Sequence, residues 1–271
     1  MTYPHRPARG TNLPATTGKA GSGPAPWTVR PIGASGSGLP LGQPSRRYEI
    51  LALDRKGNLV DEMRAAPAHP VFDSAFTAIA RGALVMTEAG PMAVEDLVPG
   101  IKVETSDAGL QTLMWRGAAL IQPRMKDGVP QPGLWRIPME SFGPQRPAPD
   151  LVLGPGARLV WRSPELIERV GTKAALVPLP AFDDSFSVVR IAPASPVRVF
   201  HLGFRRHHII AVNGIEIETV HPGPDALARM GTEVARIYLS LFPHFEHLSD
   251  FGPLALPRLG RDAAEALLHL G

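Results

Sequence analysis

The feature that most constrains the fold of this chain is a long series of short apolar runs, separated from one another by Gly, Pro or Asp. The runs have the length and the β-branched content of strands, and the breaks between them are too short to hold helices. Such spacing favours a mostly β domain of coiled hairpins over alternating strands and helices. Representative runs are ALVMT at 83–87, IKVET at 101–105, VRVFHLGF at 197–204, HIIAV at 208–212 and IEIETV at 215–220.

A separate β-hairpin is predicted ahead of this series, within residues 47–72. YEILALD at 48–54 and LVDEM at 59–63 are β-like, and Lys56-Gly57-Asn58 between them has the chemistry of a tight turn. We therefore expect this hairpin to lead into a main β domain that spans residues 73–221.

Helical periodicity is confined to the C-terminal part, where we expect a helical extension over residues 222–271. DALARMGTEVARIYLSLF, at 225–242, places apolar residues on one face of a helix, and Asp225 is expected to cap its start. RDAAEALLHL, at 261–270, predicts a second, short helix. The residues expected on the buried face of the first helix are Leu227, Met230, Val234, Ile237, Tyr238 and Leu241.

The N-terminal 46 residues differ from the rest, with eight Pro, eight Gly and no apolar periodicity. Such a segment cannot bury enough apolar surface to offset its chain entropy, which predicts a disordered tail over residues 1–46. Residues 1–48 carry six Lys or Arg and no acid, so 22 basic residues face 25 acids in the remainder, a balance of −3. Because the six charges are spread thinly, we favour a solvated leader over a nucleic-acid or lipid contact.

Composition removes several classes of function. No apolar run approaches the roughly 18 residues that span a bilayer, and the first residues lack the apolar segment of a secretory signal, so we expect a cytoplasmic protein. The chain has no Cys, which removes disulfides, thiolate nucleophiles and Cys-based zinc sites. No cofactor is indicated. A protein partner and the oligomeric state stay open.

Two longer motifs carry the functional information. The first, AIARGALVMTEAGPMAVEDLVPG at 78–100, runs from a strand through a Gly-Pro turn at 90–91 and an acidic turn to a glycine that starts the next strand. The second, VRVFHLGFRRHHIIAVNGIEIET at 197–219, runs through two adjacent histidines to an Asn213-Gly214 turn and a last strand. The glycines supply backbone freedom where the chain reverses.

In this order and separation, the two motifs resemble the N-terminal and C-terminal blocks of Hint domains, the fold shared by inteins and the autoprocessing half of Hedgehog proteins. The resemblance covers about residues 73–245, and the continuation HPGP with a helix ending LFPHF is similar to a bacterial Hint subgroup with its own C-terminal extension. It implies a Hint-type, mostly β domain in which the first and last blocks meet. We therefore expect the strand at 83–87 to lie close to the strand at 208–212.

The resemblance also implies a reaction, an acyl shift in which the first residue of the domain attacks the carbonyl before it. That position is Ala78 here, and the position of the histidine that polarises the peptide bond is Ala157, within GPGARLV. The last His-Asn pair of inteins would fall near Glu218 and Thr219. All of these positions have lost the side chain that the chemistry needs. The resemblance therefore implies a degenerate site.

Two hydroxyl residues, Thr77 and Ser74, are candidate substitute nucleophiles. A shift of one residue along a strand turns the side chain to the opposite face, and attack geometry tolerates little displacement. Only the pair His207-His208 keeps a titratable side chain where the family has one. We favour a domain that has lost autoprocessing and has a structural or binding role. The alternative is a self-cleaving or hydrolytic protein that uses Ser74 or Thr77 with His207 or His208.

Histidines in the second half of the chain raise the question of a metal site. His207 and His208 are adjacent, so they would face opposite sides of a continuing strand, and no acidic residue is spaced to complete a zinc site. Arg205-Arg206 would repel a cation. We expect no metal at the group formed by His201, His207, His208 and His221.

The last predicted strand alternates charged and apolar residues. Glu216 and Glu218 alternate with Ile215 and Ile217, which predicts that both carboxylates lie on the solvent face. Acids at Glu95-Asp96 and Asp183-Asp184 are interpreted as turn and loop residues rather than as a general acid and base.

Overall fold

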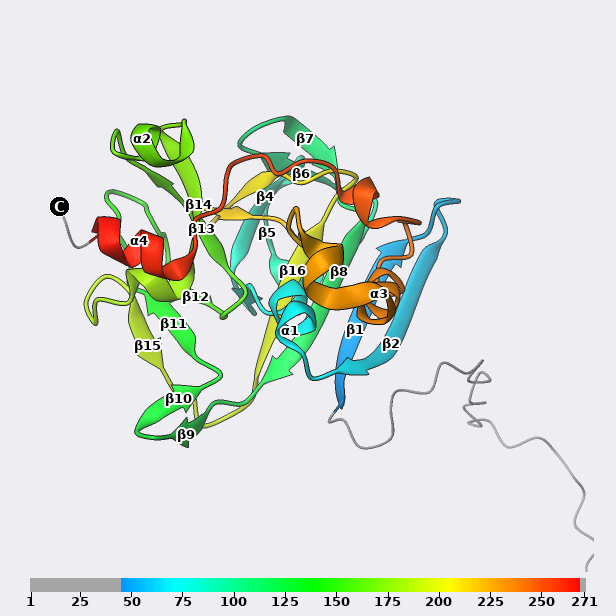
Figure 1. Ribbon diagram of the computed structural model, residues 1–271, viewed down its shortest axis with the longest axis horizontal. Helices are drawn as coiled ribbons and strands as arrows, with labels where there is room; N and C mark the ends of the chain where they lie inside the picture. The colour runs from blue at the N-terminus through cyan, green and yellow to red at the C-terminus, as the bar shows by residue number, and fades with distance from the viewer. Residues whose placement is uncertain (1–44, 269–271) are drawn as a thin grey trace, which may run out of the picture. The chain divides into compact units, whose positions relative to one another are not determined.

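The computed structural model describes residues 45–268, and the part of the predicted tail up to residue 44 lies outside them (Figure 1). Two large sheets and one small hairpin make up most of the domain, and every strand pairing named in them is antiparallel. The predicted mostly β fold is confirmed. None of the helices within residues 45–268 is both long and apolar enough to cross a membrane.

The first sheet contains the N-terminal hairpin at one edge. Its β1 and β2 pair from Ser45↔Pro67 to Leu53↔Leu59 as a hairpin, and β1 begins one residue before the predicted end of the tail at residue 46. In spatial order the strands are β15 (Val189–Ile191), β11 (Leu134–Ile137), β12 (Leu151–Leu153), β3 (Ile79–Ala80), β16 (Val197–Gly203), β8 (Trp115–Ile121), β1 (Ser45–Leu53) and β2 (Leu59–Pro67).

The second sheet unites the two sequence motifs. Its spatial order is β14 (Ala174–Pro178), β13 (Arg158–Arg162), β18 (Ile215–Glu218), β17 (Ile209–Val212), β4 (Leu84–Thr87), β6 (Lys102–Thr105) and β7 (Gly109–Thr112), with β5 (Gly90–Ala93) paired to β4. A separate hairpin is formed by β9 (Arg124–Lys126) and β10 (Val129–Gln131).

The first and last motifs meet as expected, because β4 and β17 are neighbours with Val212 opposite Val85. The Asn213 side chain reinforces the contact by accepting a hydrogen bond from the Leu84 N–H at 2.6 Å. Asn213 and Gly214 both adopt positive φ, 48° and 83°, which is the backbone that a two-residue hairpin turn needs. The Asn-Gly turn is therefore placed where the sequence predicted it.

Helices and short 3-10 turns pack against the sheets, and α1 lies against the central strands β16 and β8 of the first sheet. The seven-residue helix α1 was not predicted. Pro70 occupies its first turn, and the His69 ring accepts the Val71 N–H at 3.2 Å. The elements are α1 (Pro70–Phe76), η1 (Val94–Asp96), α2 (Leu166–Val170), η2 (Leu179–Phe182), α3 (Ala226–Leu239), η3 (Leu248–Phe251) and α4 (Arg261–Leu268).

Helix α3 departs from its predicted face at one end. Met230 and Tyr238 are buried as expected, whereas Leu227 is 56% exposed. The reason is Gly231, whose φ of 72° interrupts the helix and changes its phase, so one continuous stripe does not form. Asp225 is at the N-cap position but makes no side-chain capping bond.

Three apolar clusters hold the fold together. The main cluster lies between the two large sheets and contains buried residues from both of them. The second packs α1 and α3 around the fully buried Trp115, whose indole N–H donates to the Leu241 carbonyl at 2.8 Å. The third seats α2 and α4 against β14 and η2. The C-terminal segment is thus packed onto the β domain, as its red-orange path in Figure 1 shows.

Candidate functional site

The site implied by the sequence motifs begins at the peptide bond between residues 77 and 78. Ala78 is fully buried, and its N–H donates to the Phe200 carbonyl at 3.1 Å. The Ala78 carbonyl accepts the Gly154 N–H at 2.8 Å, and the Thr77 carbonyl accepts the Gly156 N–H at 2.9 Å. Both carbonyls that flank the implied junction are therefore held by one loop.

That loop, residues 154–157, approaches so closely that its glycines are required. A Cβ added at Gly154 would lie 2.2 Å from the Thr77 carbonyl oxygen, and one at Gly156 would lie 2.4 Å from the Ser74 carbonyl oxygen. Ala157 follows on the loop and is also fully buried. Ala78 and Ala157 belong to the same apolar cluster, so the structure brings these two sequence-predicted positions into one region.

The two candidate hydroxyl groups both donate to the backbone of α1. The Thr77 hydroxyl donates to the Asp73 carbonyl at 2.8 Å and is buried. The Ser74 hydroxyl donates to the Val71 carbonyl at 3.1 Å and is exposed. Within residues 45–268 no histidine or carboxylate accepts a hydrogen bond from either hydroxyl.

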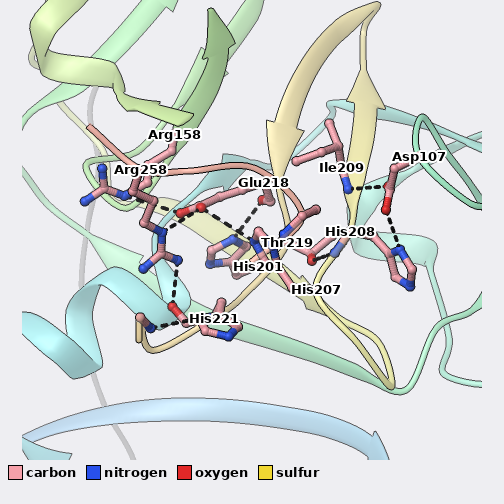
Figure 2. Close-up of polar contacts among 12 residues, drawn as sticks. Asp107, Arg158, His201, His207, His208, Ile209, Glu218, Thr219, His221 and Arg258 are labelled. Carbon is pink, nitrogen blue, oxygen red and sulfur yellow. Dashed lines mark hydrogen bonds and ion pairs between the residues drawn. The ribbon is translucent and has the colours of Figure 1, made fainter. Parts of the chain in front are cut away.

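His207 and His208 contact different partners, as Figure 2 shows. The buried His207 ring accepts the Ala255 N–H at 2.9 Å through Nδ1, and its Nε2 lies 3.6 Å from the Glu218 carboxylate. The His208 ring lies on the other side, where Nδ1 is 2.9 Å from the Asp107 carboxylate. Neither ring is hydrogen-bonded to Thr77 or Ser74.

Glu218 corrects the prediction of a solvent-facing carboxylate. Its side chain is 4% exposed and forms ion pairs with Arg258 at 3.0 Å and Arg158 at 3.4 Å. The prediction was wrong because the C-terminal segment covers this end of β18. Leu176 pairs with the backbone of Pro257 and Leu259 and so holds Arg258 over the strand. Burial alone would raise the pKa of Glu218, but His207 and the two guanidinium groups hold that pKa below its usual value.

Glu216 lies two residues earlier on the same strand and is closer to the predicted solvent-facing position. It is half-buried and forms an ion pair with Arg162 near the surface. The contrast shows that alternation alone could not reveal the Glu218 cluster, because its partner Arg258 is 40 residues away. No sequence motif marks that arginine.

Two further histidines complete the cluster. His201 is buried, its Nε2 lies 3.3 Å from the Glu218 carbonyl oxygen, and burial lowers its pKa. The His221 Nδ1 accepts the Gly223 N–H at 2.9 Å, and its Nε2 lies 2.9 Å from the Gly252 carbonyl. Burial lowers the pKa of His221 to about 4. These contacts fix a neutral imidazole with Nε2 as the donor.

The cluster borders a cavity of about 320 Å³ beside α1. Ser74 and Gly156 line one side, so the cavity adjoins the loop that holds the 77–78 bond. Arg158, Glu218 and Arg258, whose mutual contacts Figure 2 shows, also line the cavity. Among residues 45–268 no group of three or more His, Cys, Asp or Glu is arranged to hold a metal ion. The site can therefore offer guanidinium, carboxylate and backbone groups to a ligand.

The paired first and last motifs and the buried strand that begins after Ala78 are the features expected of a Hint-type β domain. The chain belongs to the Hint domain family, whose profile matches residues 77–224, more than half of its length. Among solved structures, a splice-inactive, glutathione-linked variant of the class 3 split intein AceL NrdHF is similar at 11% identity over 53% of this chain and 97% of that one. Its TM-score is 0.37, too low to support any further conclusion. No curated protein matches the sequence.

Proposed function

We propose that this Hint domain has lost autoprocessing at the bond between residues 77 and 78 and now serves as a binding domain. The observation that carries the proposal is Ala78, a fully buried methyl at the position of the implied nucleophile. The Thr77 carbonyl keeps a backbone donor, Gly156, of the kind that stabilises a developing oxyanion. A donor without an attacking group gives no acyl shift, because attack needs a nucleophile at about 3 to 3.5 Å.

The second support is the replacement of the polarising histidine by Ala157. A positioned acid or base contributes about 10² to 10⁴ in rate, and an alanine contributes none of it. Ala157 is buried in the same cluster as Ala78, which leaves the junction surrounded by apolar side chains and backbone groups. The absence of both the nucleophile and the polarising histidine also disfavours slow residual cleavage.

The alternative reaction, with a substitute hydroxyl nucleophile, has less support. Thr77 and Ser74 both donate to carbonyls of α1, and neither is hydrogen-bonded to His207 or His208. The His207 and His208 rings are themselves engaged by the Ala255 N–H and by Asp107. A nucleophile needs a base within hydrogen-bond reach, so we favour loss of activity.

The extent of the domain is part of the proposal. We assign residues 73–221 to the Hint-like β domain and residues 222–271 to an extension of the kind found in a bacterial Hint subgroup. Two contacts support an extension that completes the domain. Leu241 accepts the Trp115 indole N–H, and Arg258 covers Glu218 at the end of the last strand.

Incubation of the full chain with and without added thiol, followed by intact-mass spectrometry, tests the proposal. The unmodified chain should show no break between residues 77 and 78. Ala78→Cys alone should cleave weakly, since no polarising group is restored. Ala78→Cys with Ala157→His should cleave more than the sum of the two single variants, because such groups act as a unit.

Ala83→Cys with Ala157→His is the matched control, because Ala83 is also a buried alanine of the first motif but does not form the junction. Circular dichroism must show that each variant folds, as a histidine at a packed alanine costs about 1–3 kcal/mol. Cleavage of the unmodified chain at 77–78 would contradict the proposal. A folded double variant that resists thiol as fully as its control would contradict the assignment of the two positions.

A further inference from the structure

The cavity beside α1 has a charge that its own walls do not balance. Arg158, Arg229 and Arg258 line it, and Glu218 is the single acidic residue among its lining residues within the described chain. His221 is neutral near pH 7, because its pKa is lowered to about 4. Three positive charges against one negative charge leave an excess of two, which favours an anion in the cavity.

Two of the three arginines form ion pairs with Glu218, and the third does not. Arg258 and Arg158 pair with that carboxylate in the interior, with side chains 16% and 29% exposed. Arg229, on α3, donates to the Pro222 carbonyl and forms no ion pair with any residue in the 45–268 range. The exposed Arg229 therefore has no carboxylate partner among these residues, and its guanidinium can pair with an anion.

Arg229 and Arg258 converge on one point. A Cβ added at Gly223 would lie 2.3 Å from Nη2 of Arg229 and 3.1 Å from Nη1 of Arg258. Two guanidinium groups directed at one glycine repel each other, and an oxyanion between or beside them removes that repulsion. The planar donor fork of arginine suits carboxylate and phosphate groups in particular.

Part of the wall is apolar. The apolar lining residues include Val71 and Ala75 of α1, Val220 and Met230, and all but Val71 are buried. A volume of about 320 Å³ lies at the small end of the range for ligand sites, which is roughly 300–1,000 Å³. An inorganic ion would use the arginines and leave this apolar part unfilled.

We infer that this cavity binds a small organic anion, with a compact oxyanion head held by Arg229 and Arg258 and a short apolar tail held between α1 and Met230. The inference gives the proposed binding role a ligand class and rests on that role. It does not rest on the loss of cleavage.

Isothermal titration calorimetry on the full chain tests it with butyrate, monobutyl phosphate and acetate. At least one butyl probe should bind, and the tighter of the two identifies the head group as carboxylate or phosphate. Butyrate should bind about tenfold more tightly than acetate, because two more methylene groups are buried. Arg229→Met should weaken the tighter butyl probe about tenfold or more by removing a charge-assisted contact.

Arg169→Met is the matched control, since Arg169 is an exposed arginine on α2 that does not line the cavity. Its affinity should match that of the unmodified chain. Three results would overturn the inference: no binding of either butyl probe, binding of butyrate with the same affinity as acetate, or equal losses in Arg229→Met and Arg169→Met. Equal losses in the two variants would mean that the probe binds through general positive charge, such as that of the N-terminal residues. None of these results affects the cleavage test, which is read from mass.

Discussion

The junction around Ala78 and the cluster around Glu218 are near neighbours that have opposite chemical character. At the junction, two buried alanines pack in an apolar cluster, and the polar contacts are made by backbone groups of Gly154 and Gly156. At the cluster, a buried carboxylate is surrounded by two guanidinium groups and a histidine. The fold holds its main chain in a demanding geometry at the first place and concentrates charge at the second.

The difference teaches which features would persist if autoprocessing has been lost, as we propose. Close backbone packing depends on glycines and strand pairing, which survive the loss of single side chains, whereas a reaction depends on a few side chains. The charged cluster uses Arg258, which comes from outside the two motifs and completes the site from the C-terminal segment. A cluster of guanidinium and carboxylate groups is suited to recognition, which is the role that we propose.

The largest effect that would sharpen this comparison is expected from Glu218→Gln. Removing the carboxylate leaves Arg158 and Arg258 without their partner in a largely buried site, and breaking such a site costs about 3–5 kcal/mol. The free energy of unfolding from urea denaturation measures the loss. Glu216→Gln is the control on the same strand, where an ion pair nearer the surface contributes about 0–1 kcal/mol. Equal losses in the two variants would show that the cluster is no more than surface charge.

Much of this comparison was accessible from the sequence, and the inaccessible part has a physical cause. The Asn213-Gly214 turn follows from a local motif, β4 and β17 pair as expected, and the assignment of Ala78 and Ala157 to the junction is what the resemblance to Hint domains implies. The burial of Glu218 did not follow, because it depends on a segment 40 residues further along the chain. The phase of α3 failed for a local reason, since one glycine interrupts an otherwise regular apolar pattern.

A smaller effect is expected at the junction from Gly154→Ala. The added Cβ would lie 2.2 Å from the Thr77 carbonyl oxygen, so the backbone must move and the hydrogen bond to the Ala78 carbonyl must lengthen. Forcing an atom into a packed site of this kind costs about 1–3 kcal/mol in the free energy of unfolding. Gly260→Ala is the control, because nothing lies within 4 Å of its added Cβ, and its change should stay within about 0.5 kcal/mol. A neutral Gly154→Ala would mean that the backbone at the junction is not closely constrained.

The smallest effect concerns pH, and it separates the two regions because the junction alanines do not titrate. Burial is the main reason that the pKa of His221 is lowered to about 4; nearby His207 and Arg258 lower it further, while Gly252 and Glu218 oppose the shift. An unfolded histidine titrates near 6.5, so between about pH 6.5 and pH 4 the unfolded chain binds more protons. The contribution of His221 is therefore complete above about pH 6.5 and is lost as the pH falls toward 4, at no more than about 1.4 kcal/mol per pH unit.

His221→Gln removes this dependence, so the difference in unfolding free energy between the unmodified chain and the variant should narrow from pH 7 to pH 5. A proton NMR titration of the folded chain gives an independent check, with a His221 midpoint near pH 4. A difference that stays constant over this range would mean that the His221 ring titrates in the folded chain as it does in the unfolded chain.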